Sequence, residues 1–150
     1  MTRADLLVLT GGLGPTADDL TRDVVADVLG LPLALDDAIL ASIESRFARR
    51  GLRMPAANNQ QAMVPRGATV LANPNGTAPG LLIERGAQMI VLLPGPPREM
   101  RPMVDSLCET AWKARAGEER LYKASLFVTG RGESHVEEVA QPIYSRWRMR

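Results

Sequence analysis

The stretch LLVLTGGLGPTADDLT, residues 6–21, decides the fold class that the sequence predicts. Its first residues are a short apolar run, which is typical of a strand buried on both faces of a sheet. A glycine turn follows, and from Thr16 onward apolar residues recur with the period of an amphipathic helix. A strand, a glycine turn and a helix in this order are typical of loops that hold phosphate groups.

Length and charge limit the classes of protein to consider. The chain has 150 residues, which is enough to bury one substantial core. Its formal net charge is only +1, so it has no electrostatic reason to bind nucleic acid or a membrane surface. The sequence lacks an apolar stretch of the ~18 residues that a membrane span needs, and it lacks a signal peptide pattern. We therefore expect a cytoplasmic protein.

Apolar periodicity along the chain predicts strands that alternate with helices, which is the pattern of an α/β fold with a mostly parallel central sheet. Strands are predicted at 4–10, 88–95 and on both sides of a loop within 69–84, and helices at 16–29, 36–50 and 96–114. Residues 31–35 fit either a short strand or an extended connection. An antiparallel portion is expected at 80–93. A charged stretch at 113–123 resembles a linker, and a further strand at 121–130 and helix at 133–147 are predicted beyond it.

The glycine turn fits two kinds of phosphate site. Gly12, Gly14 and Ala17 match the G-x-G-x-x-G/A fingerprint of dinucleotide-binding dehydrogenases, and Asp36 is the acid expected about twenty residues later. However, Pro15 removes one N–H donor from the loop. The adjacent carboxylates at positions 18 and 19 would also repel a bare pyrophosphate.

Asp18 and Asp19 become compatible with a phosphate if a divalent cation lies between the charges, since Mg²⁺ binds carboxylate and phosphate oxygens. A second interpretation stays open, because acids in the first turn of a helix stabilise it through the helix dipole without any ligand. Thr16 and Asp19 also have the spacing of a capping box at the start of the predicted helix.

Three blocks of sequence, in order, resemble one known family. TGGLGPTADDLT (10–21), NNQQAMVPRGATVLANPNGTAPG (58–80) and LLPGPPREMRPM (92–103) are similar to the CinA (competence/damage-inducible protein A) amino-terminal domain, a branch of the molybdopterin-binding, MoaB/MogA-like fold. LFVTGRGESHVEEVA (126–140) resembles the start of the small middle domain that follows in CinA proteins.

The resemblance implies a fold and a domain organisation. It implies a three-layer MoaB/MogA-like α/β domain over residues 1–116, followed at 121–150 by the beginning of a small α+β domain. CinA proteins carry a further strand–helix stretch before the first block and an amidohydrolase domain after the middle domain. Neither is in this sequence, so we expect an amino-terminal truncation and no nicotinamide mononucleotide deamidation. Family relatives also imply a homo-oligomer.

The resemblance further implies metal-dependent hydrolysis of a nucleotide pyrophosphate, such as ADP-ribose or FAD, with Mg²⁺, Mn²⁺ or Co²⁺ as the cation. Whether the chain is an enzyme is left open: a pyrophosphatase of the ADP-ribose type is expected if the pocket is complete. The alternative is a non-catalytic fragment that binds a nucleotide or molybdopterin.

The loop residues have assigned roles under this hypothesis. Phosphate oxygens would be held by main-chain N–H groups and a hydroxyl, from Gly11, Gly12, Gly14 and Thr16. Asp19 is the preferred ligand of the cation and Asp18 the next, and the order reverses if Asp19 caps the helix.

Two later segments would complete the site. Asn75, Gly76 and Thr77 can form a turn that holds a second phosphate or a ribose, with Gly80 allowing close approach of the backbone. Glu99, in the first turn of a helix that follows a strand, could complete the metal site or orient water. Structural alternatives are a plain connector for the turn and helix-dipole compensation for Glu99. Asn59 and Gln61 are candidates to contact a base or sugar.

Overall fold

The computed structural model describes residues 4–117 and 121–146. These residues divide between Arg115 and Ala116 into two compact units, each of which is described by itself. Among the described residues, no helix has the length and apolar character needed to cross a membrane. The predicted domain ranges, 1–116 and 121–150, stay predictions.

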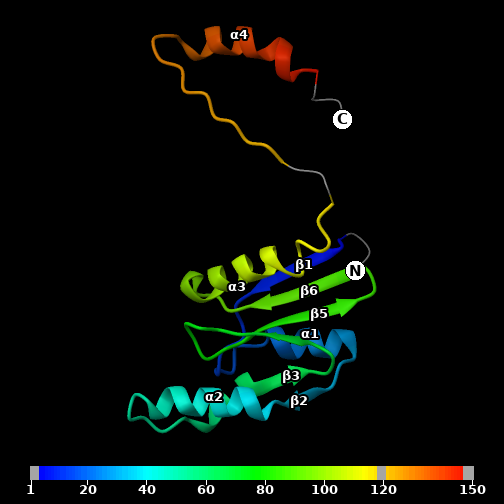
Figure 1. Ribbon diagram of the computed structural model, residues 1–150, viewed down its shortest axis with the longest axis vertical. Coiled ribbons are helices and arrows are strands. Elements are labelled where there is room, and N and C mark those ends of the chain that lie inside the picture. Colours follow the sequence, from blue (N-terminus) through cyan, green and yellow to red (C-terminus); the bar gives the residue numbers. More distant parts are fainter. Residues whose placement is uncertain (1–3, 118–120, 147–150) are drawn as a thin grey trace. The chain divides into compact units, whose positions relative to one another are not determined.

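The first unit alternates strands and helices in the predicted order, except for a short strand at 63–65 that the sequence did not predict (Figure 1). Its elements are β1 (Leu6–Thr10), α1 (Thr21–Leu29), β2 (Leu33–Leu35), α2 (Asp37–Ala48), the 3-10 helix η1 (Ala56–Ala62), β3 (Met63–Pro65), β4 (Thr69–Leu71), β5 (Gly80–Arg85), β6 (Gln88–Leu93) and α3 (Pro97–Glu109).

The main sheet has four strands in the order β1-β6-β5-β4. β1 runs parallel to β6, with Leu6 opposite Met89 and Thr10 opposite Leu93. β5 pairs antiparallel with both β6 and β4, as expected for 80–93. The α/β class is confirmed, and the sheet is mixed: in the described residues its parallel pairing is limited to β1 and β6. A separate two-stranded sheet joins β2 and β3 antiparallel.

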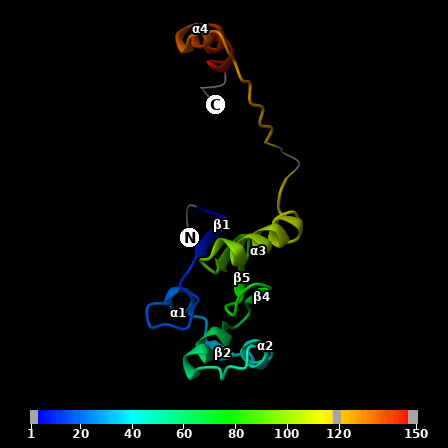
Figure 2. The same cartoon turned by 90° about the vertical axis from the view of Figure 1, so that its left-hand side faces the viewer.

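The main sheet is covered on both faces, which gives the three layers expected of the fold. Side chains alternate between the two faces of a strand, and Figure 2 shows α1 and α3 on either side of the strands. One core packs the α3 side and contains Leu82, Met89, Val91, Leu93, Met103 and Leu107. The other includes Leu81, Ile83, Ile90 and Leu92 and is covered by Val25 and Leu29 of α1.

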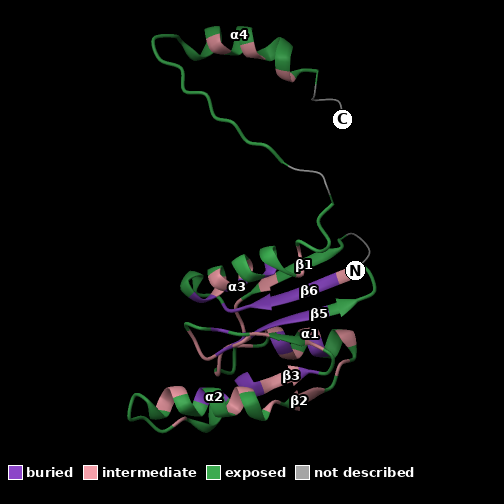
Figure 3. Ribbon diagram, in the orientation of Figure 1, coloured by how far each residue is buried: buried purple, intermediate pink, exposed green. Residues whose placement is uncertain are grey.

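Strand β1 is more exposed than its apolar sequence predicts. β5 and β6 lie buried at the centre of the sheet, whereas Leu6, Leu7 and Val8 of β1 are each close to 40% exposed (Figure 3). The prediction of a strand buried on both faces is therefore wrong for the described residues. The reason is that β1 pairs with β6 along one edge only, and none of the other strands described pairs with its second edge.

Helix α1 begins five residues later than predicted, at Thr21 instead of Thr16. Thr16 and Asp19 bond to each other, as a capping box would, but they close a turn in the loop and cap no helix. The N–H of Thr21 donates to the carbonyl of Gly12 at 3.1 Å, so the whole segment between them is a loop. Gly30 ends the helix in a left-handed conformation, as expected.

The dinucleotide-binding interpretation does not match this fold. In a dinucleotide-binding unit the strand after the first helix lies parallel to the first strand. Here β2 pairs instead with β3, in the separate sheet. Asp36, the candidate ribose ligand, caps α2 by accepting a hydrogen bond from the N–H of Ile39 at 3.0 Å. The fingerprint spacing therefore occurs in a different architecture.

The second unit contains one helix, α4 (Glu133–Tyr144), in its described part. The strand predicted at 121–130 is wrong: these residues pair with none of the strands described and are exposed. A strand needs a hydrogen-bonding partner, which apolar sequence alone cannot supply. The capping residue of α4 is Gly132, and no side chain among the described residues caps the helix. Parts of two predictions, 118–120 of the linker and 147 of the helix, lie outside the described residues.

Leu107 tests the core on the α3 side of the sheet. It is 1% exposed, so Leu107→Ala removes buried apolar contacts and should lower the free energy of unfolding by about 2–5 kcal/mol. Val28→Ala, at a position 76% exposed, should change it by less than about 0.5 kcal/mol. Urea denaturation of the two variants measures both values, and equal effects would contradict this description of the core.

Candidate functional site

Two glycine turns meet where the parallel strands β1 and β6 end. The N–H of Gly11 donates to the carbonyl of Leu93 at 2.8 Å, and a Cβ on Gly95 would lie 3.5 Å from the Cα of Gly11. Gly12 has φ +68°, and a Cβ there would lie 2.1 Å from the Thr21 hydroxyl. The loop after β1 therefore requires glycine at position 12, where a side chain would collide with Thr21, and the positive φ at Gly11 and Gly12 favours glycine at both positions. Ligands in α/β proteins commonly bind at this end of the strands.

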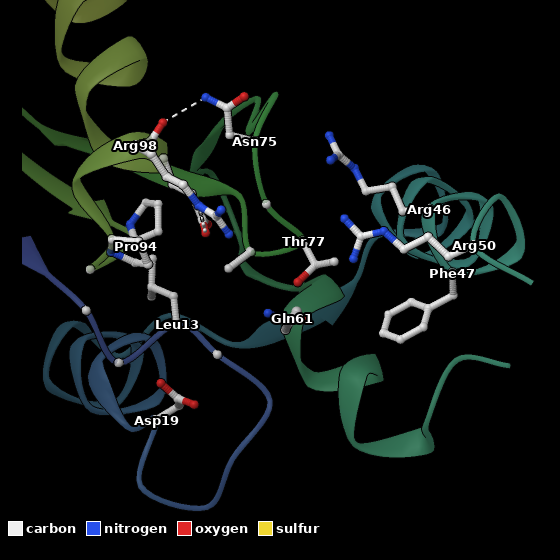
Figure 4. A pocket seen from close by; sticks show the side chains of 18 residues that line it. Leu13, Asp19, Arg46, Phe47, Arg50, Gln61, Asn75, Thr77, Pro94 and Arg98 are labelled. Atoms are coloured by element: carbon white, nitrogen blue, oxygen red, sulfur yellow. Dashed lines mark hydrogen bonds and ion pairs between the residues drawn. The ribbon is translucent and has the colours of Figure 1, made fainter. Parts of the chain in front are cut away.

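A cavity of about 430 Å³ opens at these strand ends (Figure 4). Four segments line it: the glycine loop after β1, the last turns of α2, the turn at 75–78 and the segment 94–99, with Gln61 between them. Most of the predicted site residues come together here, namely Gly11, Gly12, Gly14, Asp19, Asn75, Gly76, Thr77 and Glu99.

Three predicted residues do not line the cavity. Thr16 and Asp18 lie in the exposed part of the loop. Gly80 is buried at the start of β5, where a Cβ would lie 3.0 Å from the Met103 sulfur and 3.1 Å from the Leu92 carbonyl. Its missing side chain therefore allows protein atoms, rather than a ligand, to pack closely.

The carboxylate of Asp19 is hydrogen-bonded to Thr16, whose hydroxyl was predicted to hold a phosphate oxygen. It accepts hydrogen bonds from the hydroxyl of Thr16 at 2.6 Å and from the N–H of Thr16 at 3.0 Å. The Thr16 hydroxyl is the main cause of a lowered pKa for Asp19, with partial burial opposing it and the N–H groups of Thr16 and Gly14 and the charge of Arg22 assisting. Gly11 is engaged too, with Leu93. The loop thus holds an anion of its own.

Thr16 also contacts the second carboxylate of the loop, since its hydroxyl lies 2.5 Å from Asp18 Oδ1. A hydroxyl has one proton, so it can donate to only one of the two carboxylates at a time. The Thr16 hydroxyl oxygen and one oxygen from each of the two carboxylates therefore lie close together, with only the hydroxyl proton among them. In the described part of the chain, no group of three or more His, Cys, Asp or Glu side chains could hold a metal ion.

Glu99 enters the cavity from the first turn of α3. It is nine-tenths buried, and its Oε2 accepts a hydrogen bond from Asn73 Nδ2 at 2.8 Å. The backbone of Gly76 packs against the carboxylate so closely that a Cβ there would lie 1.9 Å from Oε2. Asn75 Nδ2 also donates to the Arg98 carbonyl at 2.7 Å, which ties the turn to α3.

Three arginines that sequence reasoning missed line the same cavity: Arg46, Arg50 and Arg98. Arg46, in the last turn of α2, and Arg50, in the turn just after the helix, extend toward the cavity on the side away from Asp19 (Figure 4). Arg46 donates to the carbonyl of Asn73 at 2.7 Å. The i, i+4 spacing of two arginines near the end of a predicted helix was a signal that could have been used, because such residues share a face. Arg98 is far from Arg46 and Arg50 in the sequence, so only the tertiary fold brings the three arginines to one cavity.

Glutamine side chains of η1 support the glycine loop. Gln60 Nε2 donates to the carbonyl of Gly14 at 2.9 Å, a contact that the sequence did not indicate. The Gln60 carbonyl in turn accepts a hydrogen bond from the buried Arg22. Gln61 lines the cavity as predicted, although its Oε1 accepts from Asn58 at 2.9 Å, whereas Asn59 lies elsewhere.

The fold and the cavity define a three-layer α/β domain with a glycine-lined site at its strand ends. The family model described as "Probable molybdopterin binding domain" matches residues 1–114, and the chain belongs to this family. The fold that the resemblance implied is thereby confirmed.

Similar proteins carry the CinA name, which confirms the resemblance. The chain is 48% identical over 141 residues to a "Putative competence-damage inducible protein" of Caldicellulosiruptor bescii, covering 94% of this chain and 34% of that protein. It is 51% identical over 137 residues to a protein of the same name from Symbiobacterium thermophilum, covering 89% and 32%. The chain thus spans about a third of the length of these curated relatives.

A solved structure is also similar. It is the crystal structure of the protein CinA with unknown function from Thermoplasma acidophilum, with a TM-score of 0.63 and 34% identity. The match covers 71% of this chain and 62% of that chain. The homo-oligomer and the cytoplasmic location stay predictions.

Thr16→Val tests the bond that holds Asp19 in the loop. Loss of the hydroxyl should raise the pKa of Asp19 toward its ordinary value of 3.8, which ¹³C NMR titration of the carboxyl group measures. A lowered pKa stabilises the folded state above pH 3.8 and this contribution disappears as pH falls through the folded value. The variant should therefore lose stability at neutral pH but not in acid. Thr110→Val is the control, and an unchanged Asp19 titration in Thr16→Val would contradict the assignment.

Proposed function

We propose that the cavity binds the phosphate groups of a nucleotide pyrophosphate, of the ADP-ribose or FAD kind, and that the domain hydrolyses it with a divalent cation. The observation that carries the proposal is the meeting of three arginines with two glycine turns around one cavity. Guanidinium groups bind phosphate through paired hydrogen bonds, and glycine turns let a ligand approach the backbone.

The cationic wall supports binding of more than one phosphate. Arg46 comes from α2 and Arg50 from the turn just after it, and Arg98 comes from the opposite side of the cavity (Figure 4). The turn at Gly76 and Thr77 lies between these two sides and can add N–H and hydroxyl donors. A pyrophosphate carries enough charge and acceptor oxygens to engage both sides at once.

The glycine loop supports a cation on the other wall. Asp19 lines the cavity and Asp18 lies in the exposed part of the same loop, and their carboxylates offer oxygen ligands that suit Mg²⁺, Mn²⁺ or Co²⁺. Such ions are commonly held by one or two carboxylates together with substrate phosphates and water, so a closed cage of protein ligands is not required. A bound divalent cation would neutralise charge on the phosphoanhydride and activate water for attack.

The residues of the chain have separate tasks in this proposal. The arginines hold the phosphates in one orientation, which brings the reacting groups together before the chemical step. Asp19 anchors the cation beside the glycine turn. Gln60 holds the loop that carries Asp19 through its bond to the Gly14 carbonyl, so it positions the site without touching the ligand.

A second candidate function is binding without hydrolysis, of a nucleotide or of molybdopterin. One observation favours it: the Asp19 carboxylate is engaged by Thr16, and the described residues bring no third carboxylate, cysteine or histidine to it. A carboxylate held in this way can serve the loop structure alone. Turnover separates the two candidates, since both bind the ligand but only the first releases AMP.

Asp19→Asn tests the hydrolytic proposal. The whole chain is incubated with ADP-ribose or FAD and with Mg²⁺, Mn²⁺ or Co²⁺, and AMP is quantified by liquid chromatography. Loss of a metal ligand removes several kcal/mol of transition-state stabilisation, so we expect at least about 100-fold slower AMP release.

Asp27→Asn is the matched control, because Asp27 is an exposed residue of α1 outside the cavity. It should release AMP at the wild-type rate. Wild-type protein that binds ADP-ribose in calorimetry but releases no AMP would support the second candidate. Equal rates for Asp19→Asn and wild type would contradict the assigned role of Asp19.

A further inference from the structure

We propose that Glu99 accepts a hydrogen bond from a sugar hydroxyl of the ligand, and that Asn73 is the positioning residue that aims its carboxylate. The inference rests on the proposed function for the phosphates of that ligand. It adds a group that recognises the sugar, Glu99, to a cavity whose arginines hold the phosphates.

Asn73 holds Glu99 through a saturated set of hydrogen bonds. Its Nδ2 donates to Glu99 Oε2 and to the Ala78 carbonyl, both at 2.8 Å, and its Oδ1 accepts from the N–H of Asn75 at 3.0 Å. Both donor protons and the acceptor oxygen of this amide are therefore engaged. Since Asn73 and Glu99 are each about nine-tenths buried, neither side chain has room for many rotamers.

The backbone fixes the carboxylate from a second direction. Gly76 lies so close to Oε2 that any side chain there would collide with it. Oε2 is thus enclosed by Asn73 and Gly76, which leaves Oε1 as the oxygen available to a molecule in the cavity that Glu99 lines.

Oε1 stays available as an acceptor. It lies 4.0 Å from Arg98 Nε, which is too long for a hydrogen bond, and the Arg98 side chain is 80% exposed. An ionised carboxylate only accepts hydrogen bonds and repels phosphate oxygens, which also only accept. A ligand group at Oε1 must therefore donate.

A ribose hydroxyl is the donor that best fits this position. Glu99 shares the cavity with Arg46 and Arg50, which attract the anionic part of the ligand, and in a nucleotide the sugar hydroxyls lie only a few bonds from the phosphates. A metal ion at Glu99 is the competing assignment, and the response of pyrophosphate binding to Glu99→Gln distinguishes it from a sugar contact.

Calorimetric titrations of the whole chain, with Mg²⁺ present, test the inference using inorganic pyrophosphate, ADP and 2′,3′-dideoxy-ADP. Wild-type protein should bind ADP about tenfold more tightly than dideoxy-ADP, the value of one hydrogen bond to a charged group. Glu99→Gln should reduce this preference to less than about threefold and leave the pyrophosphate affinity unchanged or higher, because a negative charge is removed.

Asn73→Ala should also reduce the preference for ADP over dideoxy-ADP, while pyrophosphate binding persists. If Asn73 only stabilised the fold, its loss would weaken the binding of all three ligands alike. Restoring a donor with Asn73→Gln should recover part of the preference. Glu109→Gln, at an exposed carboxylate of α3, is the matched control and should change nothing.

The possible results distinguish a wrong sugar assignment from a wrong proposed function, on which the inference rests. Equal affinity of the wild type for ADP and dideoxy-ADP, with pyrophosphate bound, would overturn the sugar assignment alone. A Glu99→Gln variant that loses pyrophosphate as strongly as ADP would also overturn it and indicate a metal ligand. Failure of the wild type to bind either pyrophosphate or ADP would overturn both the inference and the proposed function.

Discussion

The hydrogen bond from the N–H of Gly11 to the carbonyl of Leu93 is the contact on which the site depends. It continues the parallel pairing of β1 and β6 one step beyond the strands, so both chains turn away from the sheet at the same edge. Each turn contains glycine, and the positive φ of Gly11 and Gly12 favours glycine where the chain leaves β1. One turn leads to Asp19 and the other to α3 with Glu99, which brings the two carboxylates to one cavity.

The side chains that line this cavity carry both negative and positive charges. Carboxylates come from the loop after β1 and from α3, whereas Arg46 of α2 and Arg50 of the turn after it lie on the far wall. Each carboxylate has its own donor inside the protein: Thr16 for Asp19 and Asn73 for Glu99. A buried or half-buried carboxylate that is hydrogen-bonded in this way keeps one orientation. A site with fixed charges can then distinguish ligands by where their own charges and hydrogen-bond donors lie. A molecule with both phosphates and hydroxyls matches that pattern better than a simple anion.

Much of the framework could be predicted from the sequence, because it depends on local patterns. The apolar period locates β1, β6, α2 and α3, and Asp36 is recognisable as a helix cap. The start of α1 was misplaced because Thr16 and Asp19 have the spacing of a capping box, and only the bond from Thr21 to Gly12 shows that they close a loop. The spacing of two residues indicates the bond between them, but it does not indicate whether a helix or a loop comes next.

Contacts between distant segments account for what could not be predicted. Asn73, Gly76 and Glu99 form one unit only in the folded chain, and nothing in their spacing indicates it. The exposure of β1 and the absence of pairing at 121–129 in the described residues have the same origin, since a strand depends on its neighbours as well as on its own residues.

The central claim is that the glycine turns and the arginine wall bind a pyrophosphate group together. The most direct measurement is a titration of ¹⁵N-labelled protein with inorganic pyrophosphate, followed by the chemical shifts of the backbone amides. The account predicts saturable shifts at Gly12, Gly76 and Thr77 and at the end of α2, with no change in α4. Saturable binding that leaves these amides unshifted, or shifts that concentrate outside the cavity, would contradict it.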